Sequence, residues 1–477
     1  MTLERFQKPL LLLMMATAWV IWGLEQEAAF ASHQSMWSQD LAFFHQILFH
    51  ASQGDAWTSP ILLEPTGFFS MVHFHPILAL ILPIYMLAPS ASTLLWINAG
   101  AVAATAWPLA KIGEKATGSL LFGLAAGAAW LVWLPARSAA IADFRPMVFL
   151  IPALAWVVWG VFAQRRAAWI AGALLCCAAR EESAYLLPSI GLLLAMGLPL
   201  GGKRRSEGLW ILGIGVFWLG FLLLFKDNFF FHFNPINLLS GEGGPSPSGE
   251  LTGDRLEFWG QSLAGGYAAA VLQPAALLFG AGPLHWLMTD AQREWHAVFG
   301  TVVYLKNPML PLIASAGTLG AAWVIRKKEK ALPAVCVLLV LGNLLGFRAE
   351  RNQFNQRRSD NRAMQNEGEV PALQTLIDAV DSEARVVTDY RLIALLSGRE
   401  VLWNRAHLYL ADSDKPPHWK ETWPLSFEVA DTVLLPEDDP LTVHLDDDWT
   451  SAQQAGGYGL WIRKAKGAGV DPAPLTH

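Results

Sequence analysis

The stretch from residue 36 to residue 76 sets the organisation of the chain. It reads MWSQDLAFFHQILFHASQGDAW (36–57), TSPILLEPTGFF (58–69) and SMVHFHP (70–76). It follows a first apolar segment and precedes an almost unbroken series of further ones, and five of the twelve histidines fall between His33 and His75, with Asp40 among them. Polar groups beside lipid are costly unless they are used or paired. We therefore take this loop as the candidate site and the rest of the chain as its scaffold.

The composition is that of a membrane protein. Of the 477 residues, 53% are hydrophobic and only 16% are charged, whereas soluble domains carry nearer a quarter charged residues. The 22 Trp and 25 Phe residues fit aromatic side chains at membrane interfaces. The three cysteines lie inside apolar runs, so the sequence indicates no disulfide framework.

Charge is unevenly distributed along the chain. Residues 1–346 hold 19 acidic and 20 Lys or Arg residues, and residues 347–477 hold 21 and 14. We interpret the second part as an acidic soluble domain, and nothing in the pattern indicates nucleic-acid binding.

The apolar runs predict an all-α polytopic bundle. The first lies within residues 1–24, after a basic start, and we favour a retained anchor over a signal peptide, for which Ala29-Phe30-Ala31 would resemble a cleavage site. The others cover roughly 76–88, 91–110, 118–135, 147–163, 168–179, 184–200, 209–225, 263–282, 302–325 and 332–346. The runs at 76–88 and 263–282 are short or interrupted by proline, and we expect them to be partial segments rather than full spans.

The positions of the basic clusters indicate which membrane topology the chain adopts. With nine full spans and two partial segments, all four fall on the side of the N-terminus, as the positive-inside rule requires. They are Lys111 with Lys115, Arg165-Arg166, Lys203-Arg204-Arg205 and Arg326 to Lys330. This predicts a multi-pass protein of the cell (inner) membrane, with a cytoplasmic N-terminus and a periplasmic or extracellular C-terminal domain.

Two domains follow from this pattern. A transmembrane domain, 1–346, carries external loops at 25–75 and 226–262, and a C-terminal α/β domain covers 347–477. In the second we expect a helix over VPALQTLIDAV and strands at RVVTDY, EVLWN, DTVLLP and YGLWIRK, with SAQQAGG ending a short helix. In the first loop, apolar residues recur at helical spacing and polar ones fall on the opposite side, which predicts an amphipathic helix on the membrane surface, capped by Ser38. The apolar residues are Trp37, Leu41, Phe44 and Leu48, and the polar ones are Gln39, Gln46 and His50.

Two candidate sites lie in the first loop. Asp40 is a general base or metal ligand in one interpretation and an acid stabilised by a helix N-terminus in the other, which is at least as well supported by spacing alone. His73 and His75 point the same way in an extended segment and could bind a metal or a phosphate, although two interfacial histidines at a helix end explain the pattern equally.

Two further polar clusters fall on the same outer face. Asp143 and Arg145 could contact a phosphate and orient an acceptor, or form a local ion pair. Arg180, Glu181 and Glu182 are three consecutive charges between two apolar runs, for which a substrate site and a solvated turn are the alternatives. One outward-facing cavity could gather all four clusters.

The order DLAFFHQ, HFHPILALILPIY, DFRP and AAREES resembles a bacterial family of multi-spanning proteins, the domain-of-unknown-function 2079 family. The match covers most of residues 36–200, and Arg145 stands where the family usually has His. That family in turn is similar to the C-type glycosyltransferases, which include protein mannosyltransferases and lipid A aminoarabinose transferases.

The resemblance implies a function. Asp40 matches the acid of the first external loop in these enzymes, and Asp143 matches the acid of the second. The implied reaction moves a sugar from a polyprenyl-phosphate carrier, the donor substrate, to an acceptor outside the membrane, and a divalent metal stays an open alternative.

Three classes of function compete. In a transferase, Asp40 would deprotonate the acceptor, His73 or His75 and Arg145 would bind the carrier phosphate, and Asp143 would orient the acceptor or a metal. A transporter or flippase would use the same cavity, and inverted repeats would favour it. A non-catalytic subunit would dock a protein partner through its acidic C-terminal domain.

Overall fold

A computed structural model describes most of the chain in two compact units. The described residues are 2–33, 38–55, 57–62, 66–67, 74–181, 183–197, 204–229, 266–272, 309–345, 369–405, 430–445 and 447–464. Unit 1 comprises residues 1–26, 70–80 and 95–354, and unit 2 comprises residues 27–69, 81–94 and 355–477. The predicted external loop 226–262 lies largely outside the described residues, and so does most of the run 263–282.

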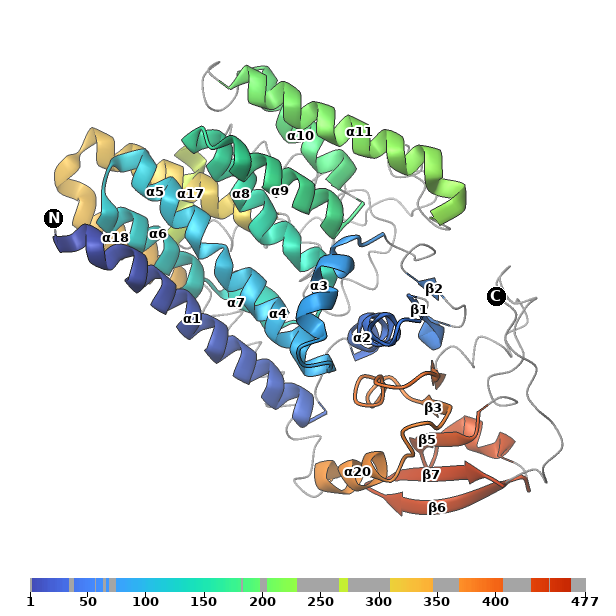
Figure 1. Ribbon diagram of the computed structural model, residues 1–477. Helices are drawn as coiled ribbons and strands as arrows, with labels where there is room; N and C mark the ends of the chain where they lie inside the picture. Colours follow the sequence, from blue (N-terminus) through green and yellow to red (C-terminus); the bar gives the residue numbers. More distant parts are fainter. Residues whose placement is uncertain are drawn as a thin grey trace, which may run out of the picture. The chain divides into compact units, whose positions relative to one another are not determined.

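Unit 1 is helical throughout its described part (Figure 1). Its elements are α1 (Thr2–Ala31), α4 (Ala91–Ala104), α5 (Ala106–Thr117), α6 (Leu120–Val132), α7 (Leu134–Ala140), η2 (Pro146–Phe149), α8 (Leu150–Ala163), α9 (Arg166–Ala179), α10 (Ser183–Ala195), α11 (Arg205–Phe229), η3 (Gly266–Leu272), α17 (Met309–Lys327), η5 (Glu329–Ala331) and α18 (Leu332–Leu345). The last five residues of α1 and the first four of α4 fall within unit 2, like part of α3 (Ile77–Tyr85).

Nine full spans are not confirmed. Five described helices are long and apolar enough to cross a membrane, or six if α6 and α7, bent by 59° at their junction, form one span. Three of the predicted spans, α9, α10 and α18, form helices of 14, 13 and 14 residues, about 20 Å each at 1.5 Å per residue. The hydrocarbon core is about 30 Å thick. The predicted partial segment after Pro76 is the nine-residue α3.

Small residues let the helices of unit 1 approach closely. α10 and α11 run side by side (Figure 1), and a Cβ atom on Gly191 would lie 2.4 Å from the backbone nitrogen of Leu212. A Cβ on Gly208 would lie 2.5 Å from the nitrogen of Ala195. Without a hydrophobic driving force in lipid, close contact of this kind is what holds helices together.

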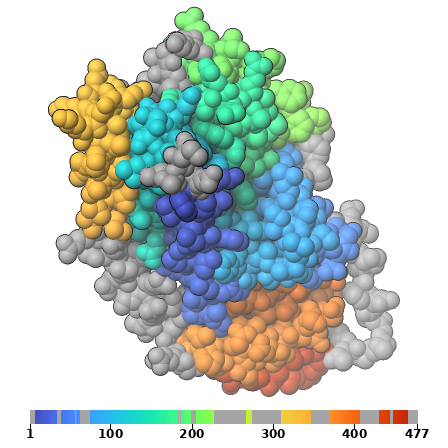
Figure 2. Space-filling model, turned by 60° about the vertical axis from the view of Figure 1, so that its left-hand side comes forward, coloured from blue at the N-terminus to red at the C-terminus, as the bar shows by residue number. Residues whose placement is uncertain are grey.

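The outer surfaces of unit 1 are apolar. Large hydrophobic side chains on α1, α11 and α18 are more than half exposed, among them Leu13, Phe217 and Leu338. Figure 2 shows the surfaces of α11 in light green and of residues 309–345 in gold. Exposed apolar surface on long helices is what a lipid environment requires, so the protein is a membrane protein.

Unit 2 contains a five-stranded sheet. Its strands are β3 (Val386–Thr388), β4 (Leu402–Asn404), β5 (Thr432–Pro436), β6 (Trp449–Ala455) and β7 (Tyr458–Arg463), in the order β4-β3-β5-β7-β6. β3 pairs in parallel with both β4 and β5, and β7 runs antiparallel to β5 and β6. α20 (Glu369–Asp378) packs on β6 and β7 (Figure 1), and η7 (Pro440–His444) follows β5.

The prediction of a short helix at SAQQAGG is wrong. Those residues belong to β6 and to the turn into β7, which form an antiparallel hairpin. Gly456 and Gly457 have φ angles of 59° and 75°, and two successive left-handed residues match the twist of a tight hairpin. The glycine pair therefore reverses a strand here instead of ending a helix.

The rest of unit 2 is built from the first loop. It contains α2 (Ser38–Gln53), the two-stranded ribbon of β1 (Thr58–Ser59) and β2 (Thr66–Gly67), and η1 (Pro60–Leu62). Asp40 lies in the first turn of α2, as predicted. The prediction of a helix with a solvent-facing polar side is wrong, because Gln46 is as fully buried as Leu41 and Leu48.

Candidate functional site

Three polar stretches, far apart in the sequence, meet in unit 1. The backbone N–H of Phe74 donates to Glu181 Oε2 at 3.1 Å, and Nδ1 of His75 lies 2.7 Å from the carbonyl oxygen of Ala179. A carbonyl oxygen only accepts, so Nδ1 of His75 carries the proton. The segment before α3 is thereby joined to the turn between α9 and α10.

The third stretch joins the same turn through Arg180. Its Nη1 lies 3.0 Å from the sulfur of Met147 in η2. η2 follows directly on Arg145, whose extended backbone (φ −141°, ψ 135°) is the conformation expected before a proline. Asp143 lies two residues earlier and is 9% exposed. The turn that carries Arg180 and Glu181 therefore contacts both the segment before α3 and the start of η2.

Glu181 is a buried carboxyl group in this region. Its side chain is 1% exposed and lies in the turn outside both helices. Burial raises the pKa of Glu181 above its ordinary value, and the charges of Arg180 and His75 act in the opposite direction.

Two buried amides hold the turn that leads to Asp143. Nδ2 of Asn98, on α4, lies 3.0 Å from each of the carbonyl oxygens of Ala139, Ala140 and Ala142. Nε2 of Gln26, on α1, donates to Ala142 at 2.8 Å and also to Ala140. Sequence reasoning missed both residues. Asn98 could have been found as a lone polar residue in an apolar run, which indicates a function or a bond.

Arg137 of α7 is paired with a residue far away in the sequence. Its guanidinium forms an ion pair with Glu25 at 2.8 Å, across 112 residues of sequence. This pair ties the end of α1 to α7, directly before the turn that carries Asp143.

Asp40 lies in unit 2 and is half-buried on α2. Its neighbour Gln39 accepts a hydrogen bond of 2.6 Å from Nδ2 of Asn404, at the end of β4. The hydroxyl of Ser38, expected to cap the helix, accepts the N–H of Ala394 at 3.2 Å. Two other predicted site residues, His73 and Glu182, lie outside the described residues.

The described residues contain no group of three His, Cys, Asp or Glu side chains that could hold a metal ion. Phe74 bonds Glu181, and the next residue, His75, bonds Ala179. Within the described part of the chain, no third His, Cys, Asp or Glu side chain completes a metal site with His75 and Glu181.

The comparisons with known proteins agree with this architecture. Residues 33–232 match the family model described as "Predicted membrane protein (DUF2079)". The resemblance to this family is confirmed. No curated protein matches the chain by sequence.

Two solved structures of ArnT from Cupriavidus metallidurans are similar in fold. The apo structure has a TM-score of 0.54 and 13% identity, covering 97% of this chain and 99% of that chain. The structure bound to undecaprenyl phosphate has a TM-score of 0.51 and 14% identity, covering 96% and 99%. The protein therefore has a fold similar to that of ArnT, with a small sheet near its C-terminus.

Proposed function

We propose that the protein is a membrane transferase that moves a sugar from a polyprenyl-phosphate carrier to an acceptor outside the membrane. The observation that carries the proposal is the meeting of three polar stretches in unit 1, at Phe74 to His75, Asp143 to Met147 and Arg180 to Glu181. They meet in a chain with the fold of ArnT, which has been solved with undecaprenyl phosphate bound.

The proposed reaction is an inverting displacement. An acceptor hydroxyl oxygen attacks the anomeric carbon of the sugar and gives its proton to the carboxylate of Asp40. The bond from that carbon to the phosphate oxygen breaks, and polyprenyl phosphate leaves with the electron pair. The charge that develops on the leaving phosphate needs cationic donors already in place.

The residues of unit 1 would supply those donors. We assign Arg145 and Arg180 to the carrier phosphate, because guanidinium groups bind phosphate with two parallel hydrogen bonds. His75, with His73 beside it, would donate to the same phosphate, and Asp143 would orient the acceptor. Glu181 and Glu182 would line the substrate site.

The proposal includes an orientation. The positive-inside pattern assigns the N-terminus to the cytoplasm and residues 347–477 to the periplasmic side of the inner membrane. This orientation puts the acceptor on the outer side of the membrane. The division into a transmembrane part, 1–346, and a C-terminal domain, 347–477, is proposed on the same pattern.

The test uses the full-length protein in detergent with synthetic undecaprenyl-phosphate hexoses and pentoses. The measured quantity is the release of undecaprenyl phosphate per folded molecule. Asp40→Asn keeps the size of the side chain but cannot take a proton, so we expect the rate to fall by about 10²–10⁴-fold.

The matched control is Asp55→Asn, an exposed acid in the same loop, which should release the carrier at the wild-type rate. Wild-type rates in Asp40→Asn would end the assignment of Asp40 as the base. Absence of release from every donor in the wild type would end the transferase proposal.

A further inference from the structure

The helix that carries Asp40 is bonded along its polar side to one segment of the C-terminal domain. This segment, residues 391–404, leads from β3 to β4, and both it and α2 belong to unit 2. Residues of α2 from its first turn to its last bond to it. They are Ser38, Gln39, His45, Gln46 and His50.

The first turn of α2 is fixed by two hydrogen bonds, one at each of its first two residues. Nδ2 of Asn404 donates to Oε1 of Gln39 at 2.6 Å, and the backbone N–H of Ala394 donates to the hydroxyl of Ser38 at 3.2 Å. Asp40 is the next residue in the chain. A displacement of either bond therefore moves the backbone from which the carboxylate of Asp40 projects.

The middle of the helix is held by buried bonds. Nε2 of Gln46 donates to the carbonyl oxygen of Arg399 at 3.0 Å, and its Oε1 accepts from the hydroxyl of Ser59 at 2.6 Å. Nδ1 of His45 lies 2.7 Å from the hydroxyl of Ser397. All four side chains concerned are at most 7% exposed, so these bonds do not compete with bulk water.

In the last turn of α2, the imidazole ring of His50 contacts two backbone carbonyl groups. Nδ1 of His50 lies 2.7 Å from the oxygen of Thr58, and its Nε2 lies 3.0 Å from the oxygen of Glu400. The helix is therefore bonded to residues 391–404 over its length rather than at one point.

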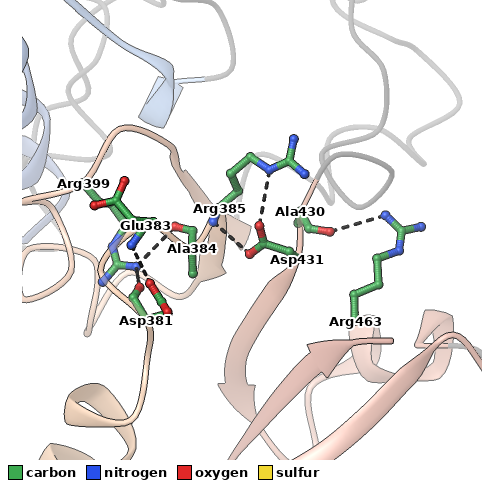
Figure 3. Close-up of polar contacts among 8 residues, drawn as sticks. All are labelled: Asp381, Glu383, Ala384, Arg385, Arg399, Ala430, Asp431 and Arg463. Atoms are coloured by element: carbon green, nitrogen blue, oxygen red, sulfur yellow. Dashed lines mark hydrogen bonds and ion pairs between the residues drawn. The ribbon is translucent and has the colours of Figure 1, made fainter. Parts of the chain in front are cut away.

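The segment itself is anchored to the sheet domain. The guanidinium of Arg399 donates to the carbonyl oxygens of Asp381 and Ala384, at 3.0 and 3.3 Å, directly before β3 (Figure 3). At the other end of β3, the carboxylate of Asp389 accepts the N–H groups of Arg391 and Leu392 at 3.1 Å each. The hydroxyl of Tyr458, on β7, donates to the same carboxylate at 2.6 Å.

We propose that residues 391–404 of the C-terminal domain position Asp40 for catalysis, with Asn404 and Gln46 as the positioning residues that carry most of the effect. The inference rests on the proposed function, in which Asp40 is the base. A catalytic group must be held within about 0.5 Å of its productive place, and an error of about 1 Å can cost about 10²-fold in rate. The soluble domain thereby becomes part of the framework of the active site.

The test compares single and swapped variants of one bond in the full-length protein. Asn404→Ala removes the donor to Gln39, and we expect it to lower kcat for release of undecaprenyl phosphate by about 10–100-fold with KM for the donor unchanged. The double variant Gln39→Asn with Asn404→Gln conserves both amides and their summed length, and should recover most of kcat. Thr375→Ala is the control, since this exposed hydroxyl bonds only within α20.

A second measurement separates this inference from the transferase proposal. Amide hydrogen exchange of residues 38–50 should become at least about 10-fold faster in Asn404→Ala and in Gln46→Met, and return toward wild type in the swap. Unchanged exchange in both variants would overturn the inference whatever the activity. So would faster exchange with wild-type kcat per folded molecule, or a swap that recovers exchange but not kcat. A wild type without release contradicts only the transferase proposal, and exchange then still decides whether the segment holds α2.

Discussion

The two acids of the proposed site are supported in different ways. Asp143 follows an irregular turn whose carbonyl groups are bonded by two amides, Asn98 and Gln26, from helices of the same unit. Asp40 lies on a regular helix that uses its own amides to bond carbonyl groups elsewhere, as Gln46 does with Arg399. In unit 1, side chains of other helices donate to the backbone of the turn before Asp143. In unit 2, side chains of the helix that carries Asp40 donate to the backbone of another segment.

The difference indicates which substitutions should destabilise each region most. An irregular turn between membrane helices leaves carbonyl groups that must be bonded inside the protein, because lipid offers no partners. Two amides supply most of those bonds. The helix in unit 2 satisfies its own backbone, and its many side-chain bonds share the task of fixing its place.

The largest effect should come from the turn before Asp143. Asn98→Leu removes an amide that is 1% exposed. The carbonyl group of Ala139 loses this donor, and those of Ala140 and Ala142 keep the donor from Gln26. We expect a loss of about 3 kcal/mol, the cost of unbonded buried polar groups. The measurement is thermal unfolding in detergent.

The matched control is the same substitution at Asn343 of α18. That side chain is fully buried, and neither its nitrogen nor its oxygen has a hydrogen-bond partner within the described part of the chain. Asn343→Leu should be neutral or stabilising, because it replaces an unbonded buried amide by an apolar group. Equal losses at the two positions would show that packing, and not hydrogen bonding, decides the role of Asn98.

An intermediate effect should come from acid acting on α2. Burial lowers the pKa of His45 to about 3, against 6.5 for the unfolded chain. Below pH 6.5 the unfolded chain binds a proton that the folded chain excludes, so stability falls with falling pH, by at most about 1.4 kcal/mol per pH unit.

At pH 5 the loss from His45 should reach about 2 kcal/mol relative to neutral pH. His45→Gln should flatten the acid side of the curve of unfolding free energy against pH and leave its shape above pH 7 unchanged. Parallel curves for the two proteins would mean that the ring titrates in the folded state as it does in the unfolded one.

The smallest effect should come from an exposed ion pair of unit 2. Nε of Arg385 lies 3.4 Å from Oδ2 of Asp431, and the two side chains are 37% and 39% exposed (Figure 3). Asp431→Asn keeps an acceptor for the N–H of Arg385 and should change the unfolding free energy by about 0–1 kcal/mol. A loss of the size expected for Asn98→Leu would put this pair among the supports of the sheet.

Sequence reasoning predicted what depends on neighbours in the chain. The start of α2 with Asp40 in its first turn, the helix α20 and the strands β3, β4, β5 and β7 follow from local patterns of apolar and polar residues. Contacts join the HFHP stretch to the REE stretch through Phe74 and Glu181, and join Arg180 to Met147, the residue after DFRP. The common site of these stretches and the roles of its residues stay predictions.

What the sequence could not indicate depends on distant partners. The polar side of α2 has the period of a surface helix whether water or another segment covers it, so its burial against residues 391–404 leaves no local signal. The ion pair of Arg137 with Glu25 likewise leaves no local pattern in the sequence from which it could be predicted. The strand β6 was missed because SAQQA has no strong preference, and only its pairing with β7 decides its conformation.

The hydrogen bonds along α2 also determine when, during synthesis of the chain, this helix can be fixed in place. Gln46 and the carbonyl group that it binds are 353 residues apart, and a ribosome that adds 5–20 residues per second needs about 20–70 s to make that length. During this interval α2 has left the ribosome, and Gln46 and His50 lack the partners that Arg399 and Glu400 supply. A chain that stops before residue 391 would contain Asp40, but it would lack the surface on which its helix is assembled, so a truncated product would carry the acid without its setting.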